Sequence, residues 1–166
     1  MKAIFLIIVL SISSQTIARE VLLDLTTPSS GVVQKIFVKA GDTVKKGKVL
    51  LALDQRVFKA SMAQAIADVK SAKLALEEAK RQLARTEDLY EQTLISDREL
   101  QLANIDFAKF ESLLKQAEKA KVKAQYELDY SQLLAPFSGK IKSVPAFPGM
   151  VVNNQIKNTV LITMSK

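Results

Sequence analysis

The chain has 166 residues, with 24 Lys and Arg against 17 Asp and Glu, and it contains neither Cys nor His. It therefore lacks disulfide bonds, thiol nucleophiles and the commonest metal ligands, and a Gly-rich phosphate loop is also absent. We predict no enzyme, no cofactor and no metal site. Lys residues of the central region alternate with Glu and Asp, so we assign the net charge of +7 mainly to a solvated helix surface rather than to nucleic-acid binding.

Residues 1–18 have the layout of a secretory signal peptide. Lys2 precedes the apolar run Ala3–Leu10, and the small residue Ala18 ends the segment. Signal peptides combine a basic start, an apolar stretch and a small residue at the cleavage site. The run is shorter than the roughly twenty apolar residues of a transmembrane helix. We expect an exported protein with a cleaved leader, and retention of residues 1–18 as an N-terminal anchor is the alternative.

Two segments of short predicted strands flank the middle of the chain and partly match each other. Gly41 in the first segment corresponds to Gly149 in the second, and each follows a run of alternating apolar residues. Alternation predicts half-buried strands, and the glycines mark turns between them. We predict that residues 19–54 and 135–166 are the two halves of one flattened β sandwich of about eight short strands.

The insert between these halves, residues 55–134, contains no Gly or Pro and keeps a helical period throughout. Apolar and small residues recur at alternating steps of three and four, which is the heptad pattern of a coiled coil. The predicted seam of the first helix consists of Phe58, Met62, Ala65, Val69, Ala72, Leu76, Ala79, Leu83, Thr86 and Tyr90. The predicted seam of the second helix consists of Leu100, Ala103, Phe107, Phe110, Leu114, Ala117, Lys121, Ala124, Leu128 and Ser131. The predicted fold class is thus α+β, a small sandwich split by an antiparallel coiled-coil hairpin.

The hairpin is expected to turn at residues 94–97. Ser96 is a good N-cap for the second helix, and Glu99, three residues later, completes a capping box. Leu94 and Ile95 fall at the tip, where apolar side chains have little core to enter. These two residues either close the end of the coiled coil or contact a partner.

The halves and their insert together resemble the split biotinyl/lipoyl-like domain of HlyD/AcrA-type periplasmic adaptors, also called membrane fusion proteins. The segments AGDTVKKGKVL at 40–50 and APFSGKI at 135–141 carry the resemblance. A biotin or lipoyl carrier has similar halves, but it presents a modified Lys on the turn between them, and no Met-Lys-Met or Asp-Lys-Ala stands there in this chain. The resemblance implies a periplasmic homo-oligomer, with a hexamer as the expected form. Its implied partners are an inner-membrane transporter and a TolC-type outer-membrane channel.

Adaptors that dock to TolC-type channels carry a tip motif of Arg-Leu, two residues, Leu, six residues and Ser. This chain has Arg85, Leu89 and Ser96 at that spacing, while Thr86 stands in place of the first Leu. The resemblance therefore implies a channel-binding set that consists of Arg85, Leu89, Leu94, Ile95 and Ser96. An intrahelical ion pair for Arg85 and a place in the hairpin interior for Leu89 are the alternatives.

Related adaptors add a β-barrel domain and a membrane-proximal domain beyond the second half of the sandwich. The sequence closes at Lys166 soon after that half, so we expect a minimal or truncated form, a product of a split gene or a reduced relative. Two other functions stay open. The first is a structural coiled-coil protein of the envelope with a different partner, and the second is a biotin or lipoyl carrier.

Overall fold

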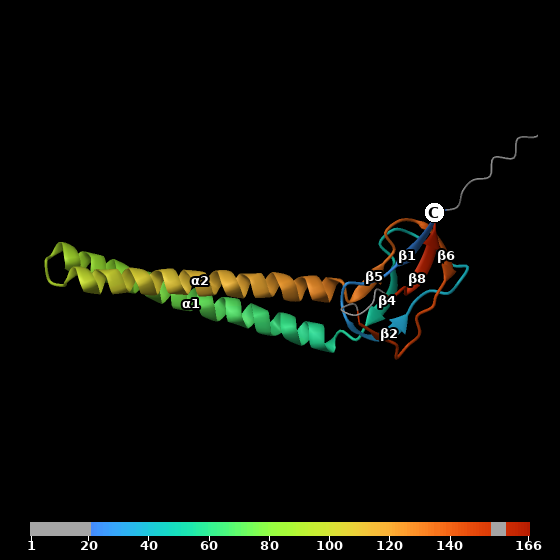
Figure 1. Ribbon diagram of the computed structural model, residues 1–166, viewed down its shortest axis with the longest axis horizontal. Coiled ribbons are helices and arrows are strands. Elements are labelled where there is room, and N and C mark those ends of the chain that lie inside the picture. Colours follow the sequence, from blue (N-terminus) through green and yellow to red (C-terminus); the bar gives the residue numbers. More distant parts are fainter. Residues whose placement is uncertain (1–20, 154–158) are drawn as a thin grey trace, which may run out of the picture.

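The computed structural model describes residues 21–153 and 159–166 of the protein. The predicted signal peptide, residues 1–18, lies outside the described residues. A rod of two helices projects from a small β platform (Figure 1). The predicted α+β architecture, a β sandwich split by a long helical hairpin, is therefore confirmed.

Eight short strands in the described residues form the platform, and they come equally from the two halves of the chain. The strands before the hairpin are β1 (Leu22–Leu25), β2 (Gly31–Ile36), β3 (Thr43–Val44) and β4 (Val49–Leu53). The strands after it are β5 (Gln132–Leu134), β6 (Gly139–Ser143), β7 (Val151–Val152) and β8 (Ile162–Ser165). Gly41 and Gly149 adopt positive φ angles of 96° and 88°. Glycine adopts such angles without steric cost, which explains the matched turns of the two halves.

Each sheet is built from strands of both halves. One sheet has the order β1-β8-β6-β3 and the other has the order β5-β4-β2-β7. All six ladders are antiparallel, and four of them join a strand of the first half to a strand of the second. Neither half can complete a sheet alone, so the two halves must fold together.

The core between the sheets is filled by apolar side chains from both halves. Leu50 and Leu53 from β4 meet Ile141, Leu161 and Met164 from beyond the hairpin, and all five have no exposed surface. Full burial of one such side chain contributes roughly 1.5–3 kcal/mol. The platform therefore draws its stability from residues that lie on opposite sides of the hairpin in the sequence.

The hairpin consists of α1 (Arg56–Glu91) and α2 (Asp97–Asp129), with 36 and 33 residues. At about 1.5 Å per residue, α1 is roughly 54 Å long. The predicted seam is confirmed along most of both helices, because its residues are buried or half-buried while most of their neighbours are exposed. Two seam positions differ, since Tyr90 at the tip and Lys121 in α2 are exposed.

The second helix ends earlier than the heptad pattern predicts. Ser131 lies beyond α2 rather than in its last turn, and residues 132–134, which the pattern assigns to the insert, form β5. Leu133 is buried in the sandwich, and β5 pairs with β4. Strand pairing and burial thus override the helical preference of this segment.

The hairpin leaves the sandwich between two strands that pair with each other. β4 ends at Leu53, β5 begins at Gln132, and Ala52 lies opposite Gln132 in the ladder. The two helices therefore take the place of the short turn that would otherwise join the strands of a β-hairpin.

Hydroxyl groups of the segment between β1 and β2 hold the root of α2. Thr27 Oγ1 donates to the carbonyl of Tyr130 at 2.6 Å, and Ser29 Oγ donates to the carbonyl of Glu127 at 3.1 Å. Carbonyls at the end of a helix have no partner within the helix, so these bonds satisfy groups that would otherwise need water. Both hydroxyl-bearing residues are buried. The segment thereby caps α2 and fixes its direction relative to the sandwich.

Polar side chains also tie the start of α1 to the end of α2. The buried Ser131 Oγ accepts a hydrogen bond from Gln55 Nε2 at 2.9 Å and donates to the carbonyl of Leu128 at 2.6 Å. Arg56 forms an ion pair with Asp54 at 2.5 Å, just before α1. The pKa of Asp54 is lowered from 3.8 to about 2. The largest cause is hydrogen bonding from the Arg56 side chain, and the next is the hydrogen bond from the Arg56 backbone N–H. The two helices are thus connected at their root as well as along their seam.

We expect Gly139→Ala to destabilise the platform strongly. A Cβ atom at this position would lie 2.1 Å from the carbonyl oxygen of Ser165, on the neighbouring strand β8. Relief of this clash requires the backbones of β6 and β8 to separate, at a cost of about 3 kcal/mol or more. The control is Gly31→Ala, whose Cβ would meet its nearest atom at an ordinary 3.5 Å. Urea unfolding of both variants measures the difference, and equal stabilities would contradict the close approach.

We expect Thr27→Val to lower the free energy of unfolding by about 1–2 kcal/mol, because it removes a buried hydroxyl but keeps the shape of the side chain. The control is Thr26→Val, at an exposed neighbouring position. The second readout is the distance between spin labels on the platform and at the tip, measured in the otherwise cysteine-free chain. A broader distance distribution is expected for Thr27→Val alone, and an unchanged one would show that the cap does not fix the hairpin direction.

Candidate functional site: the tip of the helical hairpin

The first helix ends in a backbone motif that turns the chain sharply at the tip. The N–H of Leu94 donates to the carbonyl of Leu89 at 3.0 Å, and the N–H of Thr93 donates to the carbonyl of Tyr90 at 2.9 Å. Thr93 lies between them with a φ of 62°. This pattern of two reversed bonds around a left-handed residue is the Schellman motif. A glycine usually occupies the left-handed position, so Thr93 is an unusual occupant.

The motif places two apolar residues of the predicted set at the same end of the rod. In Schellman motifs the residues at the positions of Leu89 and Leu94 commonly make an apolar contact. Leu89 is 41% exposed and Leu94 is 66% exposed, while Ile95 is half-buried. Leu94 in particular is not covered by the hairpin, so the tip presents apolar surface to solvent.

The predicted capping box at the start of α2 is confirmed. The Ser96 hydroxyl accepts from the N–H of Glu99, and the Glu99 carboxylate accepts from the Ser96 N–H at 2.8 Å. These contacts lower the pKa of Glu99. The hydrogen bond from the backbone N–H of Ser96 is the largest cause, and the bond from the Ser96 hydroxyl is the next. The Ser96 side chain is exposed, and its hydroxyl is already engaged in holding the turn.

A hydrogen bond between the two helices closes the tip. Tyr90 Oη donates to Asp97 Oδ1 at 2.8 Å, which connects the last turn of α1 to the first residue of α2. This bond to the carboxylate is the main reason that the pKa of Tyr90 is raised. The sequence pattern places Tyr90 in the seam, whereas the structure shows an exposed residue that bridges the helices by its hydroxyl.

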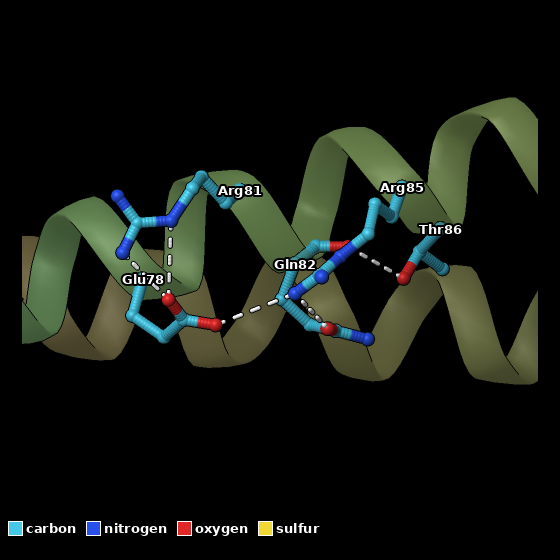
Figure 2. A network of polar contacts seen from close by, with 5 residues as sticks. All are labelled: Glu78, Arg81, Gln82, Arg85 and Thr86. Atoms are coloured by element: carbon cyan, nitrogen blue, oxygen red, sulfur yellow. Dashed lines mark hydrogen bonds and ion pairs between the residues drawn. The ribbon is translucent and has the colours of Figure 1, made fainter.

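Arg85 lies about two helical turns below the tip and belongs to a network along α1 (Figure 2). Its Nη2 lies 3.3 Å from Glu78 Oε1 and 3.0 Å from Gln82 Oε1. Arg81 binds the same carboxylate more closely, at 2.6 Å, and is the largest cause of the lowered pKa of Glu78. The Arg85 side chain is 63% exposed, and exposed pairs of this kind contribute only about 0–1 kcal/mol. Arg85 can therefore exchange this pair for another acceptor at little cost.

Thr86, which stands where the channel-docking motif has its first Leu, faces inward. It is only 8% exposed, and its Oγ1 donates to the carbonyl of Gln82 at 2.8 Å, as Figure 2 shows. Threonine in a helix often satisfies its hydroxyl in this way. The departure from the motif consequently lies in the helix–helix seam and leaves the outer surface of the tip unchanged.

The structure brings part of the predicted set together and separates part of it. Arg85 and Leu89 are four residues apart in one helix and so share a face. Leu94 follows through the Schellman turn, whereas Ser96 serves mainly as the cap of α2. Sequence reasoning missed Thr93, because only the backbone angle identifies its role. The Tyr90–Asp97 hydrogen bond could have been predicted, because the two residues lie at the two helix ends that meet at the turn.

Residues 21–153 and 159–166 contain no group of three or more His, Cys, Asp or Glu side chains that is arranged to hold a metal ion. Among the described helices, none has the length and apolar character needed to span a membrane. The features that stand out in the described residues are an extended rod, an interleaved β platform and an apolar tip, an architecture typical of binding or scaffolding proteins.

Residues 22–164 match the family described as "RND MFP, barrel-sandwich hybrid domain". The chain belongs to this family of membrane fusion proteins, the periplasmic adaptors that the sequence predicted. It is 34% identical over 111 residues to the multidrug resistance protein MdtA of Cronobacter turicensis and 32% identical over 111 residues to MdtA of Escherichia coli strain SMS-3-5. In both comparisons the match covers 67% of this chain and 27% of the relative, so the chain spans about a quarter of the relatives' length.

Solved structures share the fold. MacA from Actinobacillus actinomycetemcomitans is 28% identical with a TM-score of 0.55, and the match covers 86% of this chain and 48% of that chain. ZneB from Cupriavidus metallidurans has a TM-score of 0.62 at 23% identity, with coverage of 87% and 60%. The similarity to ZneB, at 23% identity, shows the fold alone.

We expect Thr93→Gly to stabilise the hairpin by about 1 kcal/mol, because glycine adopts the left-handed angle without the steric cost that a β-branched residue bears. The matched control is Gln92→Gly at the adjacent C-cap, where φ is −78° and glycine offers no such relief. Thermal unfolding followed by far-UV circular dichroism should show a higher Tm for the first variant only. A lower Tm for Thr93→Gly would contradict the strained turn.

Proposed function

We propose that the protein is a non-enzymatic adaptor subunit of a tripartite efflux pump or type I secretion system. In this proposal it acts in the periplasm as a homo-oligomer, with a hexamer as the expected form. The tip docks to a TolC-type outer-membrane channel, and the platform side works with an inner-membrane transporter. Membership in the membrane fusion family and the similarity to multidrug resistance protein MdtA support this role.

The observation that carries the proposal is the exposed apolar tip on a long rod. Leu89 and Leu94 offer an apolar surface, and Arg85 offers a guanidinium group on the same side as Leu89. Arginine presents several donors in a fixed fork, which suits carboxylates or backbone carbonyls of a partner. Release of Arg85 from Glu78 costs little because the pair is exposed. We therefore assign Arg85, Leu89, Leu94 and Ile95 to the docking surface, and Ser96 to its support through the capping box.

The geometry of a single hairpin supports a ring of copies. Two helices enclose no passage, so several hairpins must lie side by side to surround one. A head-to-tail contact that is repeated from copy to copy generates a closed ring when its rotation closes. A carrier role is disfavoured because the helices occupy the place of the turn on which a carrier presents its Lys. Intact mass of the exported protein provides the check, since a biotin or lipoate adduct would establish the carrier function instead.

We expect a single Cys at Gln92 to cross-link to a TolC-type channel in cells of the source bacterium. Gln92 is exposed at the tip and, unlike Thr93, has an ordinary backbone angle. Arg85→Asp should abolish the adduct, because it reverses the charge beside Leu89. The matched control is Arg81→Asp, which changes the same charge at equal exposure one turn further from the tip and should keep the adduct.

Two results would contradict the proposal. Adducts formed only with copies of the same chain or with an unrelated envelope protein would favour the structural coiled-coil alternative. Equal loss for Arg81→Asp and Arg85→Asp would mean that general charge, rather than the tip, governs the association. Circular dichroism of each variant confirms that the hairpin is folded.

A further inference from the structure

The net positive charge of the protein lies on the platform. Residues 56–129, which form the hairpin, carry thirteen basic and thirteen acidic side chains. Residues 21–54, 132–153 and 159–166, the described segments on either side of the hairpin, carry eight Lys and three Asp. The assignment of the charge to the helical region is therefore wrong, because the alternating Lys and Glu of the helices cancel one another. The platform alone is strongly basic.

Three of the platform lysines stand on one tight turn between β3 and β4. Lys45, Lys46 and Lys48 surround Gly47, whose φ is 82°, and the N–H of Lys48 donates to the carbonyl of Lys45 at 3.1 Å. A glycine with positive φ at the third position is typical of a type II turn. All three lysines are exposed, and within the described part of the chain none of them forms an ion pair.

This turn lies at the end of β4 and β5 that is remote from the hairpin. The N–H of Gly47 donates to the carbonyl of Ala135, just after β5, at 2.8 Å. The N–H of Lys46 donates to Ser138 Oγ at 3.0 Å. These bonds hold the turn against the loop that leads into β6, so the lysines occupy a fixed place on the platform.

A fourth lysine and two exposed apolar residues extend this surface across the other sheet. Thr43, just before the turn, lies opposite Lys140 on β6, which in turn pairs with Ser165 on β8. Leu22 on β1 is opposite the same Ser165 and is 59% exposed, next to Val21 at 66%. Three strand spacings amount to about 14 Å. We name Lys45, Lys46, Lys48 and Lys140 the lysine edge.

The three aspartates of the platform do not neutralise the lysine edge. Asp54 pairs with Arg56 at the hairpin root. Asp24 accepts a hydrogen bond from Thr163 Oγ1 at 2.7 Å, and Asp42 accepts one from the backbone N–H of Lys39 at 2.9 Å. Among the described residues, neither carboxylate forms an ion pair with a lysine of the edge. The edge consequently presents several positive charges beside apolar side chains.

We propose that the lysine edge binds the surface of an anionic phospholipid bilayer. Lysine carries a compact charge without the planar fork by which arginine pairs with individual carboxylates. A surface whose positive charges all come from lysines thus suits a diffuse layer of negative headgroups. Val21 and Leu22 add apolar contact at the level of the headgroups. Because the hairpin leaves the opposite end of the β4–β5 ladder, a platform bound in this way leaves the rod free of the bilayer.

The inference goes beyond the proposed function and does not need the tip to dock. Each lysine near an anionic surface strengthens binding roughly fivefold. We expect the full chain to float with vesicles of phosphatidylcholine and phosphatidylglycerol more strongly than with phosphatidylcholine alone. Joint substitution of Lys45→Gln, Lys46→Gln and Lys48→Gln should weaken binding to the anionic vesicles about a hundredfold. Neutral vesicles separate this effect from any apolar binding by residues 3–10.

The matched control replaces Lys70, Lys73 and Lys80 of α1 by Gln, which removes the same charge at equally exposed positions. This control should bind almost as the parent chain does. Binding of the parent should also disappear as the salt concentration rises toward 1 M, where the Debye length is about 3 Å. Equal binding to neutral vesicles, or equal loss in both triple variants, would overturn the proposal. Salt-sensitive binding to poly-glutamate without binding to the anionic vesicles would overturn it in favour of an acidic protein partner.

Discussion

The interleaving of the two sheets is the constraint on which the rest of the structure depends. Each sheet takes strands from both halves, and the buried core contains side chains from both. The hairpin therefore cannot behave as an independent arm, because its two ends are held by the paired strands β4 and β5. Hydroxyls of Thr27 and Ser29 then add a third attachment at the end of α2. A long insert thus becomes a rigid extension of the sandwich.

The rod and the platform separate two kinds of surface. The hairpin balances its charges along its length, so its sides carry little net field, and Leu94 presents apolar surface at its tip. The platform concentrates the lysines on turns and strand edges. Exposed charges act only over about a Debye length, roughly 8 Å at physiological salt. With a rod of about 54 Å between them, the two ends of the molecule can select different partners without electrostatic interference.

The features that sequence predicted well are those that local periodicity or short motifs determine. The seam from Phe58 to Thr86 follows a heptad step, and the capping box of Ser96 and Glu99 lies within four residues. The contacts that it missed depend on tertiary geometry. Thr27 and Tyr130 are 103 positions apart, and β5 exists only because β4 pairs with it. Thr93 escaped notice because its role is usually performed by glycine.

The tip shows how a rigid element can end in a surface that is available for binding. Apolar residues in the seam of a coiled coil are covered by the facing helix, and this cover ends where the seam stops. The Schellman turn ends the seam of α1. The backbone reverses direction at Thr93, and the N–H of Leu94 donates to the carbonyl of Leu89. The Tyr90–Asp97 bond and the capping box then hold the two helix ends together without covering Leu94. The energetic cost of the left-handed Thr93 is accordingly local, because the hydrogen bonds on both sides of it determine the turn.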